Sequence, residues 1–278
     1  GCGNETASDK LMFRKFMIDS IDFWTKEYKL GGYRFDLMGI HDIETMNQLV
    51  ASAKKINPYV CIYGEPWAGG TTALPAGSVA AVQANASQCV GYGQFNDKMR
   101  DGMIKSGMST VGNKGWVTQD AYAPDPGAIL YGIKVNTVGC TDDPDKTVSY
   151  ATCHDNYTLH DRAIVAGISD EAKIEKMNQL ANSVVFTSQG TTFMLAGEEL
   201  LRTKVVYDTN GNPVEAKDET TGKPLGRPEV SGNSYSSSYK TNEIDYSRKI
   251  SHESLFENYK KLIAFKQNTA ELHYGKND

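Results

Sequence analysis

Two short apolar segments, each ending in an acidic residue, constrain the fold of this chain most strongly. Residues 31–37 read GGYRFDL, and residues 59–65 read YVCIYGE. The segment between them has apolar residues at helical spacing, namely Ile43, Met46, Val50 and Ala53. Unbroken apolar strands are typical of parallel sheets that are covered on both faces. The sequence therefore predicts a strand–helix–strand unit with Asp36 and Glu65 at equivalent strand ends.

Strands and helices continue to alternate along the rest of the chain. Asp42 and Asn57-Pro58 predict the start and the end of the helix between the first two strands. The other predicted elements are a helix over 9–29 with Thr6 or Ser8 as its cap, a short strand or turn at 90–97 leading into a helix near 97–106, an apolar strand-like run at 147–156, a helix over 171–189, a strand at 191–199 and a helix over 251–267. This alternation predicts an α/β fold that binds ligands at the carboxyl ends of its strands.

Composition and missing motifs exclude several classes of function. The chain has 278 residues, of which 40% are hydrophobic, and a net charge of −5 without a basic stripe, so nucleic acid is not an expected partner. No apolar run reaches the length of a membrane span, and a membrane is not expected either. Neither G-x-G-x-x-G nor a P-loop motif occurs, so a nucleotide-binding open sheet is not indicated. Residues 107–146 and 203–250 are polar, and we expect them to be excursions at the surface.

The five cysteines do not indicate a metal site or a disulfide framework, because their number is odd and no C-x-x-C pair occurs. We expect Cys61 and Cys153, which lie in apolar runs, to be buried thiols. The chain starts with GCGNETASDK and has no signal peptide, so it reads as the interior of a longer protein, and the sequence indicates no compartment.

Three acidic residues at predicted strand ends, Asp36, Glu65 and Asp155, suggest a chemistry. Two carboxyl groups in different environments can divide the cleavage of a glycosidic bond between a nucleophile and a proton donor. Arg34 shares a strand face with Asp36 and should keep it ionised, as a nucleophile requires. Glu65 lies between Tyr63 and Pro66-Trp67, and an apolar aromatic setting raises the pKa of a carboxyl group, as a general acid requires.

Each of these residues also has a structural interpretation. Arg34 and Asp36 alone could form a structural ion pair, and Glu65 alone could cap the next helix. His154, Asp155 and Asn156 could form an ordinary turn. It is the appearance of all three acidic residues at strand ends that favours catalysis.

Several motifs resemble a known enzyme family. GYRFDLMG, YGEPW and ATCHDN are similar to the second, third and fourth conserved regions of glycoside hydrolase family 13, the α-amylase family. Within it, CGNETAS, FNDKMRD, AGEELLRTK and the NSY segment near residue 233 resemble type I pullulanases. The resemblance implies that the chain, taken as one partial catalytic domain over 1–278, carries about strands four to eight of a (β/α)8 barrel with their helices.

The resemblance also implies an activity and a set of site residues. The activity is hydrolysis, with retention, of α-1,6-glucosidic branch linkages in pullulan, starch or glycogen. Asp36 would be the nucleophile, Glu65 the acid/base and Asp155 the stabiliser of the transition state. The implied substrate-binding residues are Arg34, Trp67, His154, Asn156, Arg202, Asn233 and Tyr235. No organic cofactor is expected, and no contiguous Asp/Asn loop indicates a structural calcium ion.

The chain departs from the family pattern in its loops and in its extent. Tyr239 stands where these enzymes usually have Asp, and Tyr246 where they usually have Trp. No segment of this sequence resembles the first three strands of the barrel or the usual C-terminal β-domain. An open barrel exposes strand edges, so we expect either self-association through them or cover by the N-terminal segment and residues 203–250. The alternative functions are a non-catalytic structural or carbohydrate-binding piece, or another specificity within the α-amylase family.

Overall fold

The fold is built around a five-stranded parallel sheet in the order β1-β2-β3-β4-β5. The structure, a computed structural model, describes residues 6–70, 72–105, 115–118, 126–133 and 141–275. The strands are β1 (Gly32–Phe35), β2 (Cys61–Gly64), β3 (Gly93–Phe95), β4 (Thr147–Ser149) and β5 (Thr191–Thr192). Strand order follows chain order, as expected when each strand is followed by a crossover and a parallel neighbour. The predicted α/β class with a parallel sheet is confirmed.

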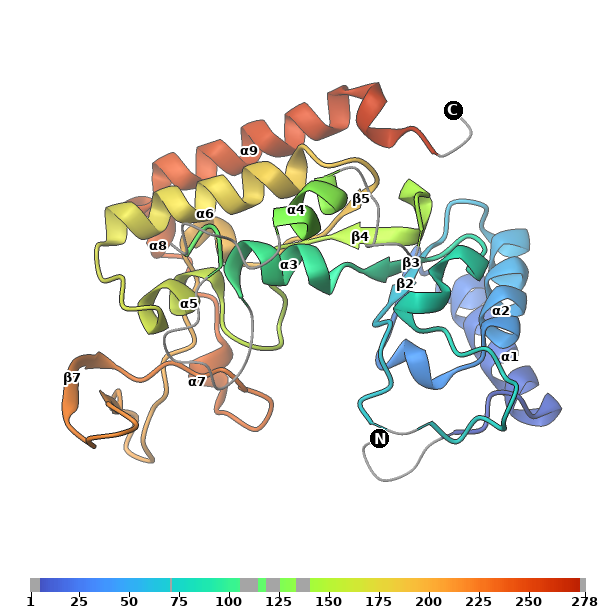
Figure 1. Cartoon of the computed structure of the whole chain (residues 1–278), viewed down its shortest axis with the longest axis horizontal. Helices are drawn as coiled ribbons and strands as arrows, with labels where there is room; N and C mark the ends of the chain where they lie inside the picture. The colour runs from blue at the N-terminus through green and yellow to red at the C-terminus, as the bar shows by residue number, and fades with distance from the viewer. Residues whose placement is uncertain (1–5, 71, 106–114, 119–125, 134–140, 276–278) are drawn as a thin grey trace.

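Helices lie along the sheet in two groups (Figure 1). They are α1 (Leu11–Glu27), α2 (Ile43–Ile56), α3 (Asp97–Ile104), α4 (Pro126–Ile133), α5 (Leu159–Val165), α6 (Glu171–Phe186), α7 (Tyr239–Asn242), α8 (Arg248–Ser251) and α9 (Glu253–Asn268). Helices α1 and α2 pack together beside β1 and β2, whereas α6 and α9 pack together at the other end of the sheet. The helices predicted over 9–29, 97–106, 171–189 and 251–267 are confirmed as α1, α3, α6 and α9.

The start of α2 is tied to the start of α1. As predicted, Asp42 caps α2, and its side chain accepts a hydrogen bond of 2.8 Å from the Thr45 backbone N–H. The prediction that Thr6 or Ser8 caps α1 is wrong, because the cap residue is Lys10, which makes no side-chain capping bond. Ser8 is instead buried and donates its hydroxyl to Asp42 at 2.6 Å.

The outer face of the sheet is well covered beside β1 and β2. Tyr33 and Ile62, which are neighbours in register, pack into a core with Met46 and Leu49 of α2. A second core joins α3, α5, α6 and α9, and its buried members include Met99, Leu159, Ile174, Leu255 and Tyr259. These two cores hold the strand ends in place.

The inner face of the sheet is filled only in part. Phe95, Val148 and Tyr150 are buried there, and Tyr63, Trp67, Cys153 and Phe193 pack against them at partial exposure. Cys61 points to this face, because its neighbour Ile62 points to the outer one. The prediction that Cys61 is buried is wrong, since its side chain is exposed where the inner face is open, and Cys153 is only partly buried.

Some predicted elements are shorter than expected, and others were missed. The runs at 147–156 and 191–199 are paired only over β4 and β5, after which the chain leaves the sheet in loops. The segment 203–250 is more than a surface loop, because it holds α7, α8 and the antiparallel hairpin of β6 (Glu215–Lys217) with β7 (Pro224–Pro228). Within the excursion at 107–146, the structure describes 115–118, α4 and residues 141–146, which end in the turn at Pro144–Lys146.

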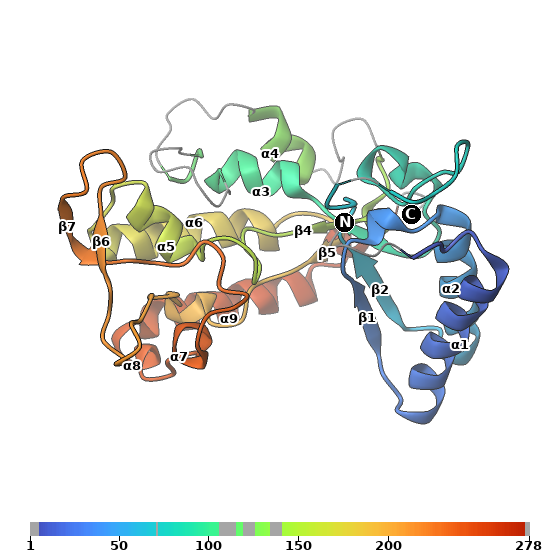
Figure 2. The same cartoon turned by 90° about the horizontal axis from the view of Figure 1, so that it is seen from below.

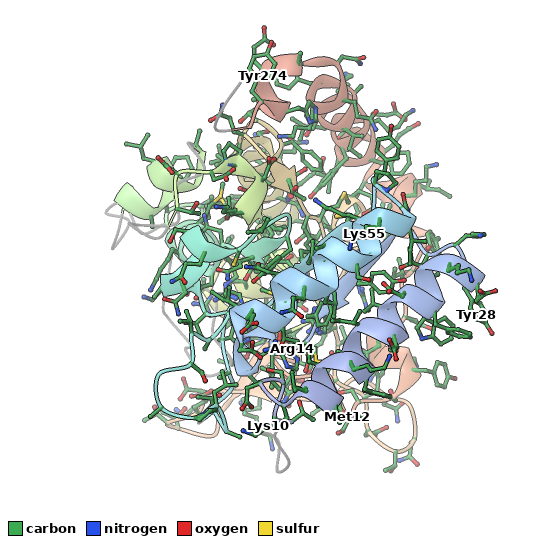
Figure 3. All side chains as sticks on the ribbon, turned by 90° about the vertical axis from the view of Figure 1, so that its right-hand side faces the viewer. Lys10, Met12, Arg14, Tyr28, Lys55 and Tyr274 are labelled. Atoms are coloured by element: carbon green, nitrogen blue, oxygen red, sulfur yellow. The ribbon has the colours of Figure 1, made fainter. Side chains whose placement is uncertain are left out.

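The edge of the sheet at β1 carries no partner strand among the described residues (Figure 2). Beside this edge, α1 exposes large apolar side chains, including Met12 and Tyr28, which are 78% and 60% exposed (Figure 3). The bridges that the structure gives for 203–250 lie within that segment, at Val205–Val230 and Tyr207–Pro213, and do not reach β1 or β5. Among the described residues, no helix has both the length and the hydropathy that a bilayer span needs.

We expect the chain to self-associate through the β1 edge. Light scattering at micromolar concentration should then detect particles larger than one chain, because unpaired N–H and C=O groups beside apolar side chains favour strand pairing. The matched variant is Gly31→Lys, since a side chain at Gly31 meets no atom within 4 Å and places a charge beside the edge. This variant should be more monomeric than the wild type. A monodisperse wild-type monomer whose β1 amides exchange rapidly would contradict the prediction.

Candidate active site

One arginine connects two of the three predicted catalytic residues. Arg34 on β1 donates from Nη1 to the Asp36 carboxylate at 2.8 Å and from Nη2 to the Glu65 carboxylate in a short hydrogen bond. The strand register explains why Arg34 reaches both carboxylates. Arg34 pairs with Tyr63 on β2, and Asp36 and Glu65 each follow two residues later, just after the ends of β1 and β2. The prediction that Arg34 and Asp36 point the same way is confirmed. The hydrogen bond from Arg34 to Glu65 is a further contact that was not predicted.

Glu65 and Asp36 differ sharply in their exposure to solvent. Glu65 is 3% exposed, and its second carboxylate oxygen accepts the Leu37 backbone N–H at 2.7 Å. The Asp36 side chain is 74% exposed. Burial raises the pKa of Glu65 above its ordinary value, in the predicted direction, although the Leu37 N–H and Arg34 act against it.

The backbone at Leu37 is unusual in a way that serves this contact. Leu37 has a φ of +43°, in the left-handed region that non-glycine residues seldom adopt. This turn follows β1 at once and directs the Leu37 N–H at Glu65. Sparsely populated backbone conformations cluster at functional sites, where the surrounding structure holds them.

Asp155 lies on the loop after β4, between two cavities. The first, of about 230 Å³, is lined by His154, Asp155, Leu195, Arg202, Lys204, Ser234, Tyr235 and Asn242. The second, of about 430 Å³, is lined by Trp67, Asp97, Arg100, Cys153, Asp155, Asn156, Gly232 and Asn233. The Asp155 side chain is 57% exposed, with His154 Nε2 3.5 Å from its carboxylate. Its negative charge adds to that of Asp36 in raising the pKa of Glu65, after the larger effect of burial.

The structure brings the predicted site residues to one region but gives some of them structural contacts. All seven predicted substrate-binding residues except Arg34 line one of the two cavities beside Asp155. The Arg202 guanidinium donates to the carbonyls of Ala196 at 3.1 Å and Asn242 at 2.6 Å, so it also holds the loop around α7. Tyr235 is 95% exposed beside this cavity. The unusual residues Tyr239 and Tyr246 are exposed as well.

Sequence reasoning assigned no role to several residues that line these cavities. Arg100 of α3 donates to the Tyr150 hydroxyl at 2.9 Å and to Asp101 at 2.8 Å, and Asp97 lines the same cavity. A signal was present, because the motif FNDKMRD follows the carboxyl end of β3, where site residues gather in parallel α/β folds. Lys204 had a comparable signal, because it ends the motif AGEELLRTK, whereas Asn242 is the last residue of the short helix α7.

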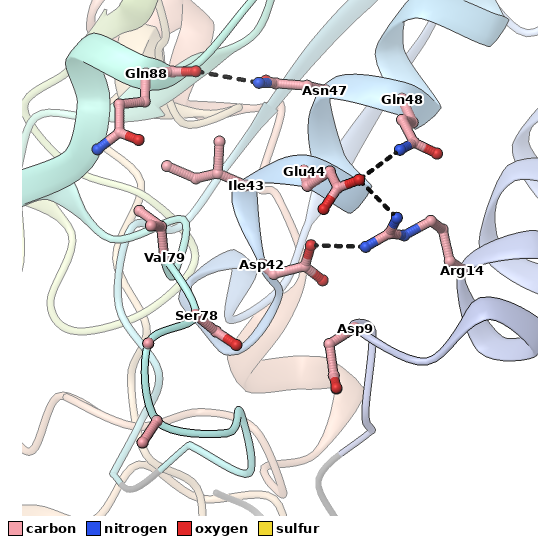
Figure 4. Close-up of a pocket in the computed structure, with 12 residues that line it drawn as sticks. Asp9, Arg14, Asp42, Ile43, Glu44, Asn47, Gln48, Ser78, Val79 and Gln88 are labelled. Atoms are coloured by element: carbon pink, nitrogen blue, oxygen red, sulfur yellow. Dashed lines mark hydrogen bonds and ion pairs between the residues drawn. The ribbon is translucent and has the colours of Figure 1, made fainter.

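A separate polar cavity of about 660 Å³ lies beside the starts of α1 and α2 (Figure 4). Arg14 reaches both Asp42 at 3.3 Å and Glu44 at 3.0 Å, and the fourth charged residue of the lining, Asp9, pairs with Lys10 at 2.6 Å. Among the residues described, no group of three or more His, Cys, Asp or Glu side chains is arranged to hold a metal ion. This cavity contains none of the predicted site residues.

No family model matches the chain. A pullulanase of Bacillus subtilis (strain 168) is 29% identical over 273 residues, which cover 96% of this chain and 34% of the relative. Pullulanase A of Streptococcus pneumoniae serotype 4 is 28% identical over 293 residues, covering 96% of this chain and 22% of that protein.

Solved structures give the same result. The structure of pullulanase from Bacillus acidopullulyticus aligns with a TM-score of 0.82 at 33% identity, covering 99% of this chain and 30% of that one. A pullulanase of Anoxybacillus sp. LM18-11, in complex with maltotriose, aligns with a TM-score of 0.81 at 32% identity over 98% of this chain and 35% of that one. The chain is therefore a parallel α/β protein that is similar to pullulanases over nearly its whole length. It matches a segment of these proteins and covers between 22% and 35% of the length of the four named above.

Proposed function

We propose that the chain carries the catalytic carboxylates of a retaining glycoside hydrolase that cleaves α-1,6-glucosidic branch linkages in pullulan, starch or glycogen. The observation that supports this best is the contact of one guanidinium, that of Arg34, with both Asp36 and Glu65. A single guanidinium can bridge only carboxylates that lie close together, and retaining enzymes hold theirs about 5–5.5 Å apart. In this proposal β1–β5 are about strands four to eight of a (β/α)8 barrel.

The different environments of the two carboxyl groups suit the two roles. Glu65 is buried and burial raises its pKa, which suits the residue that donates a proton to the glycosidic oxygen. Asp36, exposed to solvent, attacks the anomeric carbon and forms a covalent glycosyl intermediate. Glu65, now deprotonated, then takes a proton from the water that hydrolyses this intermediate.

Asp155 would stabilise the transition state, with His154 and the residues of the two neighbouring cavities holding sugar hydroxyl groups. Substrate-binding roles are proposed for Arg34, Trp67, His154, Asn156, Arg202, Asn233 and Tyr235. Pullulanases of known structure bind maltotriose, maltotetraose and maltohexaose, which supports an α-glucan as the ligand. This mechanism uses neither an organic cofactor nor a metal ion.

The proposal is tested by incubating the chain with pullulan and measuring reducing ends and products. Cleavage of α-1,6 bonds in pullulan releases maltotriose, whereas amylose, which contains α-1,4 bonds only, should not be cleaved. Equal release from amylose would indicate another specificity within the α-amylase family. No release from either polymer would contradict catalysis by this chain.

A second candidate function is carbohydrate binding without catalysis. It is favoured by the partly filled inner face of the sheet, where Cys61 is exposed, and by the aromatic side chain of Tyr235 at the rim. Aromatic side chains on an open surface can stack on sugars without the remaining parts of a catalytic site. Retarded migration in a pullulan-containing native gel, with no release of reducing ends, would support this function.

A further inference from the structure

A buried lysine lies directly behind the loop that carries Asp155. Lys204 is 1% exposed, and its ammonium group donates to the carbonyl oxygen of His154 at 3.1 Å and, in a short hydrogen bond, to that of Asn156. The two carbonyls belong to the residues immediately before and after Asp155. One side chain therefore holds the backbone on both sides of this acidic residue.

The conformation of this loop depends on such contacts. Asn156 has a φ of +62°, in the left-handed region, so the loop turns sharply after Asp155. The Asp155 side chain is 57% exposed, and the His154 Nε2 atom lies 3.5 Å from its carboxylate. Because a mostly solvated side chain has few contacts of its own, its position depends mainly on the backbone to which it is attached. The position of the Asp155 carboxylate is therefore set by the two peptide groups that Lys204 binds.

Lys204 is itself anchored to a buried residue. Its backbone N–H donates to the Asp161 carboxylate at 2.8 Å, and the Thr203 hydroxyl donates to the same carboxylate at 2.5 Å. Asp161 is fully buried near the start of α5, next to the cap residue Thr158. The Asp155 loop is thus connected to a rigid helix start through Lys204.

We propose that Lys204 is a positioning residue that holds Asp155 in place against Asp36 and Glu65. This inference rests on the proposed function, because it concerns the residue expected to stabilise the transition state. An ammonium group supplies three charged donors from one point, whereas a methionine side chain of similar length supplies none. Loss of these two hydrogen bonds should leave residues 154–156 unchanged in sequence but allow their backbone, and with it the Asp155 carboxylate, to move.

The test compares Lys204→Met with a matched variant, Lys266→Met. Lys266 is also a buried lysine, 6% exposed, and donates to two backbone carbonyls, those of Ser188 at 2.5 Å and Leu272 at 3.2 Å. It lies in α9, away from the carboxylates. Both variants remove a buried ammonium group and two hydrogen bonds, so both should lower the thermal midpoint.

Only the Lys204 variant should affect the site. We expect Lys204→Met to lower kcat on pullulan by roughly 100-fold, the scale of a misplacement by about 1 Å, with KM changed less than about threefold. Amide exchange of residues 154–156 should accelerate by at least about tenfold because the loop opens locally. Lys266→Met should leave kcat and the exchange of this loop within about threefold of the wild type.

The outcomes separate this inference from the proposed function. If the wild type hydrolyses pullulan and Lys204→Met keeps its kcat, the positioning role is overturned while the function stands. If the wild type shows no hydrolysis, the proposed activity of this chain fails, and amide exchange alone then tests whether Lys204 holds the Asp155 loop. Exchange at 154–156 that rises equally in both variants would overturn the role, and a rise confined to Lys204→Met would support it.

Discussion

Replacing Glu65 with Gln should lower the rate of pullulan hydrolysis by about 10²–10⁴-fold, the usual contribution of general acid–base catalysis. Glutamine keeps the shape of the side chain and can still face Arg34 and the Leu37 N–H. It carries no proton that can be transferred to the leaving oxygen. Reducing-end release under saturating pullulan measures the effect. The loss should be much smaller on an aryl α-glucoside with a good leaving group, because that group departs without a proton.

Two further variants show whether the effect is specific. Asp36→Asn removes the proposed nucleophile and should abolish hydrolysis of both substrates by about 10⁴-fold or more. Glu44→Gln is the control, because Glu44 has an exposed carboxylate that is paired with Arg14 at 3.0 Å in the separate polar cavity. It should keep full activity. If Glu65→Gln retained hydrolysis of pullulan, Glu65 would not be the general acid.

Replacing Glu198 with Gln should make the folded protein more stable at alkaline pH. Glu198 follows β5, is 1% exposed, and neither of its carboxylate oxygens has a hydrogen-bond partner among the described residues. The Asn182 side chain and the Leu195 backbone lie close enough to act against burial, but burial has the larger effect on the pKa of Glu198. Burial raises the pKa of Glu198 to about 8. The side chain is therefore protonated in the folded state at neutral pH.

The sign of the pH dependence follows from this pKa. The unfolded chain ionises Glu198 near pH 4.5, so the free energy of unfolding falls as the pH rises from there towards 8. At about 1.4 kcal/mol per pKa unit, the loss is on the order of 4 kcal/mol. Glutamine does not ionise and avoids this loss. Urea unfolding should show a gain of a few kcal/mol for Glu198→Gln at pH 8 and almost none at pH 4.

A neighbouring residue is the control for this experiment. Glu199 is partly exposed, and its carboxylate accepts the Gly197 N–H at 2.9 Å, so Glu199→Gln should give no gain at pH 8. Burial lowers the pKa of His160, but hydrogen bonds to Asp161 and Glu171 outweigh burial and raise that pKa to about 9. The contribution of His160 to the free energy of unfolding is lost as the pH rises through 9. The wild type and the Glu198→Gln variant lose it equally, so the difference between them is unaffected. Equal stability of wild type and Glu198→Gln at pH 8 would contradict the prediction.

Local patterns in the sequence were sufficient to predict the elements that bear the candidate site. The period of apolar residues predicted α1, α2, α6 and α9, and the apolar runs before Asp36 and Glu65 predicted β1 and β2 as parallel neighbours. The short helix α5 was missed because its seven residues are too few for a period to be recognised. The β6–β7 hairpin was missed because 203–250 is polar and its strands do not alternate clearly.

The sequence by itself determined the α/β class, the strand–helix–strand unit of β1, α2 and β2, and the identity of the acidic residues at the strand ends. These follow from spacing along the chain, which fixes which side chains share a face. Only the tertiary structure decided that Arg34 reaches Glu65 as well as Asp36, that Cys61 is exposed, that Glu198 is buried without a partner, and that Lys204 holds the Asp155 loop. Each of these depends on residues far apart in sequence, and burial and hydrogen bonding between such residues exist only once the chain has packed.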